Sequence, residues 1–272
     1  MSTDSGQALL AGRSVIAVSG NDARDFLQGL ITNDVRQVTP QLAIFTALLS
    51  PQGKFLYDFF IIEHEGKLLL DIERMYEAEL VKRLSMYKLR AQVEIAPLSD
   101  WQVAAVWGTP PAGQGEVIYA DPRLPAMGVR MLGRNLSVAG DEETYHAYRL
   151  ALAIPDGAKD LTQNRSLPME WGYDKLNAID FNKGCYVGQE VTARSKHRAT
   201  LHKMVHRVQA DTALPPRDTA IMSGEREVGQ MASSNGNIGL AMLNLDAVAS
   251  GAPLEAAGVK LQAERPAWSL IP

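Results

Sequence analysis

The only cysteine of the 272-residue chain is Cys185, within the stretch FNKGCYVGQE at residues 181–190. A free cysteine is most often a small buried hydrophobic residue without chemistry. Here Lys183 precedes the thiol, and the flanking Gly184 and Gly188 suit a tight turn. Nearby cations stabilise the thiolate, which is the form that reacts and binds metals. The pattern therefore favours a reactive or metal-binding thiol on a turn.

One thiol cannot hold an iron–sulfur cluster alone, because such clusters need several cysteine ligands. Cys185 could supply one ligand of a cluster shared between two proteins or two subunits. No H-E-x-x-H or C-x-x-C motif is present. His197, His202 and His206 lie close together, but no carboxylate stands at a suitable spacing. We interpret His202 and His206 as partly exposed histidines on one face of a strand.

The region around Cys185 is basic and has one acid, Glu190. Its six cationic residues are Lys183, Arg194, Lys196, Arg198, Lys203 and Arg207. Such a run usually forms a solvated surface. It could also hold a polyanionic ligand, such as a polyglutamate tail or a phosphate backbone.

The composition is that of a globular protein with a core, with 46% hydrophobic and 21% charged residues. The net charge of −4 makes direct binding of nucleic acid unlikely on electrostatic grounds. A single cysteine excludes an internal disulfide framework and fits a reducing compartment. No signal peptide or apolar membrane span is recognisable, so we expect a cytoplasmic protein. Dinucleotide-binding, P-loop and nucleophile-elbow motifs are also missing.

Hydrophobic patterns over the first 97 residues predict the order β-α-β-β-β-α-β. This order is typical of a ferredoxin-like antiparallel sheet with helices on one face. The predicted elements are a strand or hairpin at 7–18, a helix at 22–31, strands at 42–49, 55–62 and 68–72, a helix at 75–89 and a strand at 91–97.

The rest of the chain divides into two further regions. Residues 98–140 contain short strand patterns, and a helix begins at 142 and ends near Pro155. Residues 156–182 are irregular, which in an ordered segment is usual for a functional stretch or a linker. Short strands from 201 onward indicate a small β-barrel or sandwich. We expect three domains: a ferredoxin-like α+β domain at 1–97, a second α+β domain at 98–199 and a C-terminal β-barrel at 200–272.

The segment KGCYVGQEVTAR, residues 183–194, resembles the K-G-C-Y-x-G-Q-E-x-x-A-R signature of the YgfZ-type folate-binding proteins. These are bacterial counterparts of the mitochondrial iron–sulfur maturation factor of the same family. Three further blocks resemble the family in order: FLQGLITNDV at 26–35, PQGKFLYD at 51–58 and LPME at 167–170. The resemblance covers essentially the whole chain, and the wider superfamily includes the glycine-cleavage T-protein, a tetrahydrofolate-dependent aminomethyltransferase.

The resemblance implies an α+β fold like that of the T-protein, with two domains around a central cavity and a C-terminal β-barrel. It implies a folate-binding accessory protein that supports iron–sulfur cluster assembly or repair in client enzymes through Cys185. Lys183 and Arg194 would stabilise the thiolate or hold anionic groups of a ligand. The residues expected to support the motif are Gly184, Tyr186, Gly188, Gln189, Glu190 and Arg194.

The resemblance also implies that tetrahydrofolate binds in the central cavity, where Asp58 is the candidate carboxylate of the protein. Tyr145 is a candidate surface for the pterin, and Gln28, Asn33 and Trp171 are further candidate contacts. The expected partners are iron–sulfur carrier proteins and client enzymes, and we expect a monomer that binds neither membrane nor nucleic acid directly.

Two departures from the T-protein argue against its chemistry here. Where the T-protein has two adjacent aspartates, this chain has Tyr57 and Asp58, and Ala151 replaces a pterin-binding glutamate. An alanine methyl group cannot accept the pterin hydrogen bonds that a carboxylate accepts. The first alternative is nevertheless a tetrahydrofolate-dependent aminomethyltransferase, in which Asp58 steers the one-carbon unit. A second alternative is a protein associated with transfer-RNA modification, which would use the basic stretch.

Overall fold

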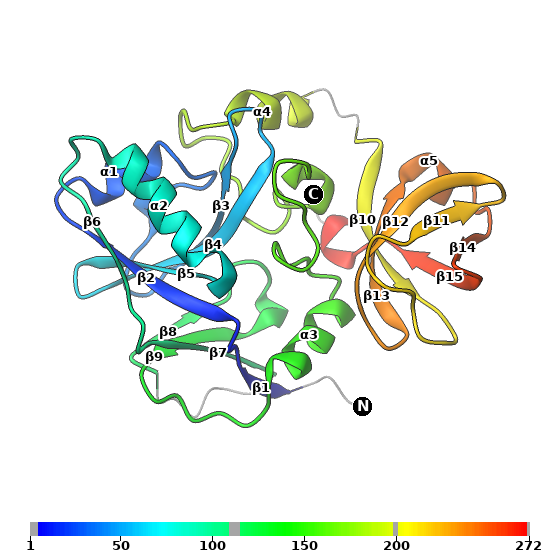
Figure 1. Cartoon of the computed structure of the whole chain (residues 1–272), viewed down its shortest axis with the longest axis horizontal. Coiled ribbons are helices and arrows are strands. Elements are labelled where there is room, and N and C mark those ends of the chain that lie inside the picture. Colours follow the sequence, from blue (N-terminus) through cyan, green and yellow to red (C-terminus); the bar gives the residue numbers. More distant parts are fainter. Residues whose placement is uncertain (1–4, 109–114, 198–200, 271–272) are drawn as a thin grey trace.

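The first of three β-sheets is five-stranded and antiparallel, with the order β3-β4-β5-β2-β6 (Figure 1). The computed structural model of the chain describes residues 5–108, 115–197 and 201–270. The strands of this sheet are β2 (Arg13–Ser19), β3 (Ile44–Leu49), β4 (Phe55–His64), β5 (Lys67–Glu73) and β6 (Glu94–Pro97).

The second sheet is four-stranded and includes the first strand of the chain. Its order is β1-β7-β9-β8, with β1 (Gly6–Leu9), β7 (Gln102–Trp107), β8 (Val117–Ala120) and β9 (Val129–Gly133). The hairpin considered for residues 7–18 is therefore wrong. Strand β1 pairs with β7, whereas β2 pairs with β5 and β6. Tertiary pairing decides this, because the local sequence is equally compatible with a hairpin.

The helices are short and lie on sheet faces or at connections. They are α1 (Ala23–Gln28), α2 (Glu77–Lys88), α3 (Glu142–Ala151), α4 (Gln189–His197) and α5 (Leu245–Ala249), with 3₁₀ turns at Val35–Gln37, Arg74–Tyr76, Pro125–Met127, Pro168–Trp171 and Ala267–Leu270. Leu27 of α1 and Leu80 and Leu84 of α2 pack against one face of the five-stranded sheet, as expected for a ferredoxin-like unit. The basic stretch after Cys185 forms α4, a helix that the sequence analysis did not predict.

The C-terminal region forms the predicted barrel. Six strands close in the order β10-β13-β12-β11-β14-β15. They are β10 (Lys203–Gln209), β11 (Ala220–Ser223), β12 (Arg226–Asn235), β13 (Ile238–Asn244), β14 (Leu254–Ala256) and β15 (Val259–Glu264). Of these strands only β11 was not predicted. The expected domain limit at 199–200 lies outside the described residues.

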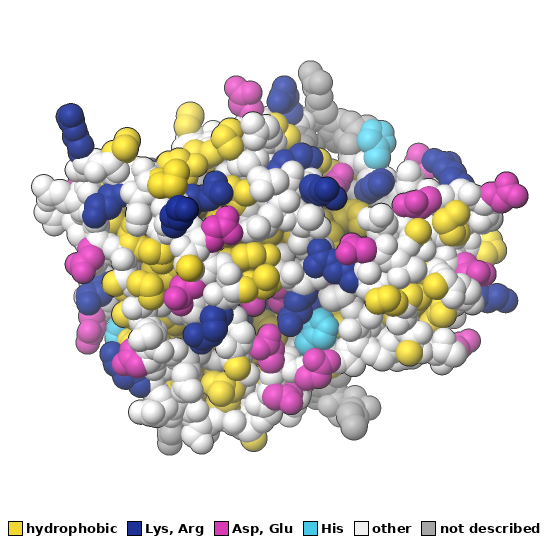
Figure 2. Space-filling model, in the orientation of Figure 1, with side chains coloured by type: hydrophobic (Ala, Val, Ile, Leu, Met, Phe, Trp, Pro, Cys, Tyr) yellow, Lys and Arg dark blue, Asp and Glu magenta, His cyan; other side chains and the backbone are white. Residues whose placement is uncertain are grey.

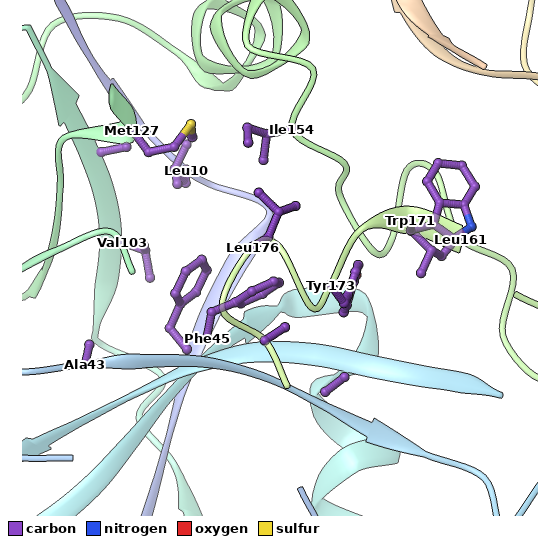
Figure 3. Close-up of a cluster of buried hydrophobic side chains, with 14 of the residues drawn as sticks. Leu10, Ala43, Phe45, Val103, Met127, Ile154, Leu161, Trp171, Tyr173 and Leu176 are labelled. Atoms are coloured by element: carbon purple, nitrogen blue, oxygen red, sulfur yellow. The ribbon is translucent and has the colours of Figure 1, made fainter. Parts of the chain in front are cut away.

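The space between the two sheets is filled by a large hydrophobic cluster (Figure 3). Phe45 of β3 and Leu176 lie near its middle, and the side chains of Leu10, Met127 and Ile154 converge on them from other segments. Trp268 attaches the end of the chain to this core. Its indole Nε1 donates to the Leu152 carbonyl at 3.2 Å. Residues of all three structural regions therefore contribute to this cluster, while the barrel also has a hydrophobic core of its own.

A buried ionic network joins the two sheets beside this cluster. Asp71 of β5 is fully buried and pairs with Arg13 of β2 in its own sheet. From the other sheet, Arg130 Nε donates to Asp71 Oδ2 at 2.8 Å, and Tyr119 Oη donates to the same oxygen at 3.2 Å. Burial of a single carboxylate is costly unless cations and donors surround it. Asp71 therefore fixes the relative position of the two sheets.

Among the described helices, none combines the length and the apolar character needed to cross a bilayer.

The substitution Asp71→Asn tests this junction. The amide loses the negative charge and turns donors toward buried guanidinium groups, so we expect a loss of about 3–5 kcal/mol in the free energy of unfolding. Denaturant unfolding measures it. Asp100→Asn is the matched control, because Asp100 pairs with Arg134 at 2.6 Å on the surface and exposed pairs contribute about 0–1 kcal/mol. Equal small losses for both variants would show that Asp71 has no special role.

Candidate functional site

Cys185 lies exposed on a short loop that leads into α4. Gly184, just before it, has a φ of +94°, in a region that side-chain-bearing residues rarely adopt. A Cβ on Gly184 would meet no atom within 4 Å, so backbone conformation alone requires glycine here. The thiol predicted from the motif is therefore presented to solvent on a turn rather than buried in the core.

Both ends of the thiol loop are tied to the C-terminal end of α1. The Lys183 Nζ donates to the carbonyl oxygens of Gln28 at 2.7 Å and Ile31 at 2.5 Å. In return the Gln28 Nε2 donates to the Lys183 carbonyl at 3.3 Å. At the other end, Val187 N donates to Gly29 O at 3.3 Å. These contacts, which we call the α1 clamp, hold residues 183 and 187 in place and leave Cys185 between them.

Lys183 is only 5% exposed, and its ammonium group is directed to backbone carbonyls. Burial lowers the pKa of Lys183 to about 8, although Asp34 and Asp180 favour its charged form. Carbonyl oxygens at a helix C-terminus lack partners within the helix and attract cations. Lys183 was expected to act on the thiol. The geometry instead makes it a positioning residue for the loop.

The end of the motif rests on the β3–β4 hairpin, which reaches α4 in Figure 1. A Cβ on Gly188 would lie 2.6 Å from the Ser50 carbonyl oxygen. A Cβ on Gly53 would lie 2.7 Å from the Cβ of Val191 in α4. Real Cβ atoms do not approach so closely, so both glycines are needed for this contact. The PQGK block at 51–54 is thus part of the site.

The four sequence blocks of the resemblance converge around the thiol. Block 26–35 provides the α1 clamp, and block 51–58 provides the hairpin turn. Block 167–170 overlaps the 3₁₀ turn Pro168–Trp171, which packs against α4. The blocks are up to 155 residues apart in sequence. The order of the blocks in the sequence does not indicate that they lie close together in the folded chain.

The remaining motif residues divide into packed and exposed groups. Tyr186 is 8% exposed, and the Lys183 Nζ lies 5.1 Å from the centroid of its ring. Gln189 N donates to the Tyr186 carbonyl at 3.2 Å, where α4 begins. Glu190 and Arg194 are exposed on α4. Tyr186 is therefore buried at the turn, whereas the two charged residues face solvent.

The basic run does not form one continuous surface. Arg207 is on β10, where it pairs with Glu264 at 2.7 Å. The side chains of Lys196 and His197, and residue Arg198, lie outside the described part. His206 is buried, not partly exposed as expected, and its Nδ1 is 2.9 Å from the Met204 carbonyl. Within the described residues, no group of three or more His, Cys, Asp or Glu side chains could hold a metal ion.

A second site predicted from the sequence is a small cavity between the two sheets. Asp58 and Tyr145 both line it, together with Leu10, Arg13, Phe45, Phe60, Glu73, Arg123, Arg130, Glu142, His146, Arg149, Asp156, Gly157 and Lys159. Its volume is about 20 Å³, which is room for about one water molecule. The structure brings the two predicted residues together, but side chains fill most of the space between them.

Asp58 projects into this cavity from β4. Its Oδ2 accepts a hydrogen bond of 2.8 Å from Tyr173 Oη, and Gly157 lies against its Oδ1. Burial, and next the charge of Asp156, raises the pKa of Asp58 to about 6. Tyr57 packs in the cluster under the helices on the opposite face of the sheet, because side chains alternate along a strand. An acid in place of Tyr57 would therefore not reach the cavity at this register.

Tyr145 is held by the cavity's arginines. Its hydroxyl oxygen accepts from Arg123 Nη2 at 2.6 Å and from Arg130 Nη1 at 3.3 Å. Its ring lies 6.1 Å from that of Trp107, centroid to centroid. Tyr145 is thus a buried part of the ionic network, and its ring is not an open platform for a ligand.

A pterin does not fit the central cavity with the side chains as they lie in this structure. The other candidate contacts lie elsewhere. Gln28 belongs to the α1 clamp, Asn33 donates from Nδ2 to Phe45 O at 2.8 Å, and Trp171 is in the core. Ala151 lines a separate groove with Trp268. Folate binding stays a prediction from the resemblance.

Comparison with known proteins supports the sequence resemblance. The human "Iron-sulfur cluster assembly factor IBA57, mitochondrial" is 31% identical over 95% of this chain and 84% of its own length. The mouse protein of the same name is 30% identical over 88% of this chain and 77% of its own. Residues 203–270 match the family model described as the C-terminal beta-barrel domain of CAF17. The names place these relatives in mitochondria, which contradicts the cytoplasmic location expected from the sequence.

A solved structure supports the fold. The glycine cleavage system aminomethyltransferase T from Bartonella henselae superposes with a TM-score of 0.77 over 96% of this chain and 85% of that chain. The sequence identity is 13%, so the likeness concerns the fold alone. The T-protein-like architecture predicted from the sequence is confirmed.

The substitution Lys183→Met tests the α1 clamp. It leaves two helix-end carbonyls without their buried donor, so we expect a loss of about 1–3 kcal/mol in the free energy of unfolding. We also expect faster hydrogen exchange of the Val187 amide. The control is Lys82→Met on the exposed side of α2, which should change neither quantity. Unaltered Val187 exchange in the Lys183 variant would contradict the positioning role.

The substitution Asp58→Asn tests the cavity carboxyl. Because the folded-state pKa is raised, the contribution of this group to stability is complete below its unfolded pKa of about 4 and is lost as pH rises through 6. The amide can still accept from Tyr173. We therefore expect the variant to exceed the wild type by up to about 3 kcal/mol at pH 7, with the difference vanishing near pH 4.

Unfolding measured between pH 4 and 8 checks this prediction. Asp211→Asn on the exposed surface is the control and should follow the wild type. A stability difference between the Asp58 variant and the wild type that does not change with pH would contradict it.

Proposed function

The chain belongs to the IBA57 family of iron–sulfur cluster assembly factors, and from this premise we propose that it acts on clusters through the thiol of Cys185. The named relatives support a role in iron–sulfur cluster assembly. The observation that carries the proposal is an exposed, unique cysteine on a loop clamped at both ends. The cluster is the cargo of this reaction and not a resident cofactor.

The thiol works by supplying one ligand to iron. Coordination replaces the S–H bond by an S–Fe bond and releases the proton, because the thiolate is the binding form. A [2Fe–2S] cluster takes four protein ligands, usually cysteines. Since the chain has one cysteine, the other ligands come from a second protein. Cluster binding at Cys185 is therefore shared binding, suited to passing a cluster onward.

The α1 clamp prepares the loop for this encounter. Residues 183 and 187 are hydrogen-bonded to the end of α1 before any partner arrives. Pre-organisation lowers the conformational entropy lost on binding. The partners on this proposal are iron–sulfur carrier proteins, which bring the cluster, and client enzymes, which receive it.

The two alternative functions gain no support from the geometry. One-carbon transfer needs space for folate beside Asp58, and the cavity holds about 20 Å³. RNA binding needs a surface of predominantly positive charge to pair with the phosphates. On the face shown in Figure 2, acidic and basic side chains are interspersed.

The substitution Cys185→Ser tests the proposal. It changes one exposed atom, so the thermal unfolding curve should stay unchanged, while support of iron–sulfur enzymes in a deletion strain should be lost. Thr212→Ser, at an exposed residue outside the thiol loop, is the control and should retain support. Full restoration of enzyme activities by the Cys185 variant would show that the thiol is not the working group.

A further inference from the structure

An incompletely paired sheet edge borders a slot whose opposite wall runs directly into the thiol loop. Strand β3 is an edge strand of the five-stranded sheet. One part of its outer edge is closed by the chain itself. Thr32 N donates to Ala47 O at 2.9 Å, Ala47 N donates to Thr32 Oγ1 at 2.9 Å, and Ile31 bridges Leu48. The backbone groups of Ala47 therefore point outward, away from β4.

The other part of this edge has free backbone groups. In an antiparallel strand, alternate residues direct their N–H and C=O to the same side. Ala43 and Phe45 therefore point outward like Ala47, whereas Ile44 and Thr46 pair with β4. Phe45 O accepts from Asn33 Nδ2. For the Phe45 N–H and for both backbone groups of Ala43, the described residues provide no hydrogen-bond partner.

Ala43 lines a surface slot of about 460 Å³, which we call the β3 slot, and Phe45 lies two residues further along the chain. It is lined by Asn33, Gln37, Leu42, Ala43, Ile44, Pro122, Asn177, Ile179, Asp180, Phe181 and Asn182. Leu42 is 53% exposed at its rim. Natural proteins usually protect such edges with lysine, proline or bulges. Residues 42–45 read Leu-Ala-Ile-Phe and have none of the protective side chains.

The slot is continuous with the thiol loop. Its wall includes residues 179–182, and Lys183 follows directly. Cys185 is three positions after Asn182 in the sequence, so their Cα atoms are at most about 11 Å apart. Anything that fills the slot is therefore brought near the thiol, which needs ligands from another protein.

We propose that an extended segment of the cluster-carrying partner adds a strand to β3 at Ala43–Phe45 and thereby places the partner's cluster at Cys185. This rests on the function proposed above. Backbone hydrogen bonds supply affinity in strand addition, and pockets for alternate side chains supply selectivity. The free N–H and C=O groups select a polypeptide strand over a small molecule. The exposed side chain of Leu42 favours an apolar side chain on that strand.

Hydrogen exchange at single-residue resolution, read by mass spectrometry with electron-transfer fragmentation, tests the proposal. The probe is a [2Fe–2S]-loaded iron–sulfur carrier protein from the same organism. At saturating carrier, exchange at the Ala43 and Phe45 amides should slow at least about tenfold. The Ile44 and Thr46 amides, which already pair with β4, should not change. The slowing should persist in Cys185→Ser, because docking does not use the thiol.

A charge variant provides the matched comparison. Leu42→Lys places a lysine at the edge and should weaken carrier binding at least about tenfold without changing the melting temperature. Met86→Lys, at a residue 66% exposed on α2, should leave binding within about twofold. Equal effects of the two variants would overturn the proposal.

The remaining outcomes separate this inference from the proposed function. A Cys185-dependent cluster spectrum without protection of Ala43 and Phe45 overturns strand addition and leaves the thiol's role intact. Protection without such a spectrum supports the docking site and overturns the thiol's role. Protection that rises with the chain's own concentration, in the absence of carrier, assigns the slot to a second copy and overturns the proposal.

Discussion

The carboxylate of Asp71 holds Arg13 and Arg130, and through them it joins the five-stranded sheet to the four-stranded sheet. Charges this deeply buried are tolerated only when they are paired and hydrogen-bonded. The same network reaches Tyr145, whose hydroxyl accepts from two arginines. With Phe45 and its hydrophobic neighbours, it fills the space between the sheets. Side chains thus fill most of the cavity between the two sheets, which has a volume of about 20 Å³.

Because the interior is filled, the candidate reactive group is the surface thiol of Cys185. Cys185 is exposed, and among the described residues it belongs to no group of three or more His, Cys, Asp or Glu side chains that could hold a metal ion. What it has is a fixed position, since the ammonium of Lys183 is bound to the end of α1. A held but exposed thiol can meet a second protein without rearrangement of its own loop. The β3 slot beside it would add the directional contact that a single thiol lacks.

The resemblance blocks acquire a physical meaning in the structure. Gly53 and Gly188 are required because the hairpin and the start of α4 approach more closely than side chains allow. The Gln28 side chain donates to the Lys183 carbonyl, and the backbone carbonyl of Gln28 accepts from the Lys183 ammonium. Sequence reasoning assigned Gln28 to folate and Lys183 to the thiol. In the structure these two residues are hydrogen-bonded to each other. The only clue in the sequence was that both belong to blocks that resemble the family.

The local sequence was sufficient to predict an element wherever the hydrophobic pattern of that segment determines its secondary structure. The alternating and apolar runs predicted β4, the strands of the barrel except β11, and α2. The glycines around Cys185 predicted an exposed turn, and Gly184 has the expected positive φ.

Tertiary structure alone decided the partner of Lys183, the pairing of β1 with β7 and the filling of the central cavity. The physical reason is distance along the chain. The Lys183–Gln28 bond joins residues 155 positions apart, and no local preference specifies which carbonyl a buried ammonium will meet. Burial against distant segments, and not propensity, determines those contacts.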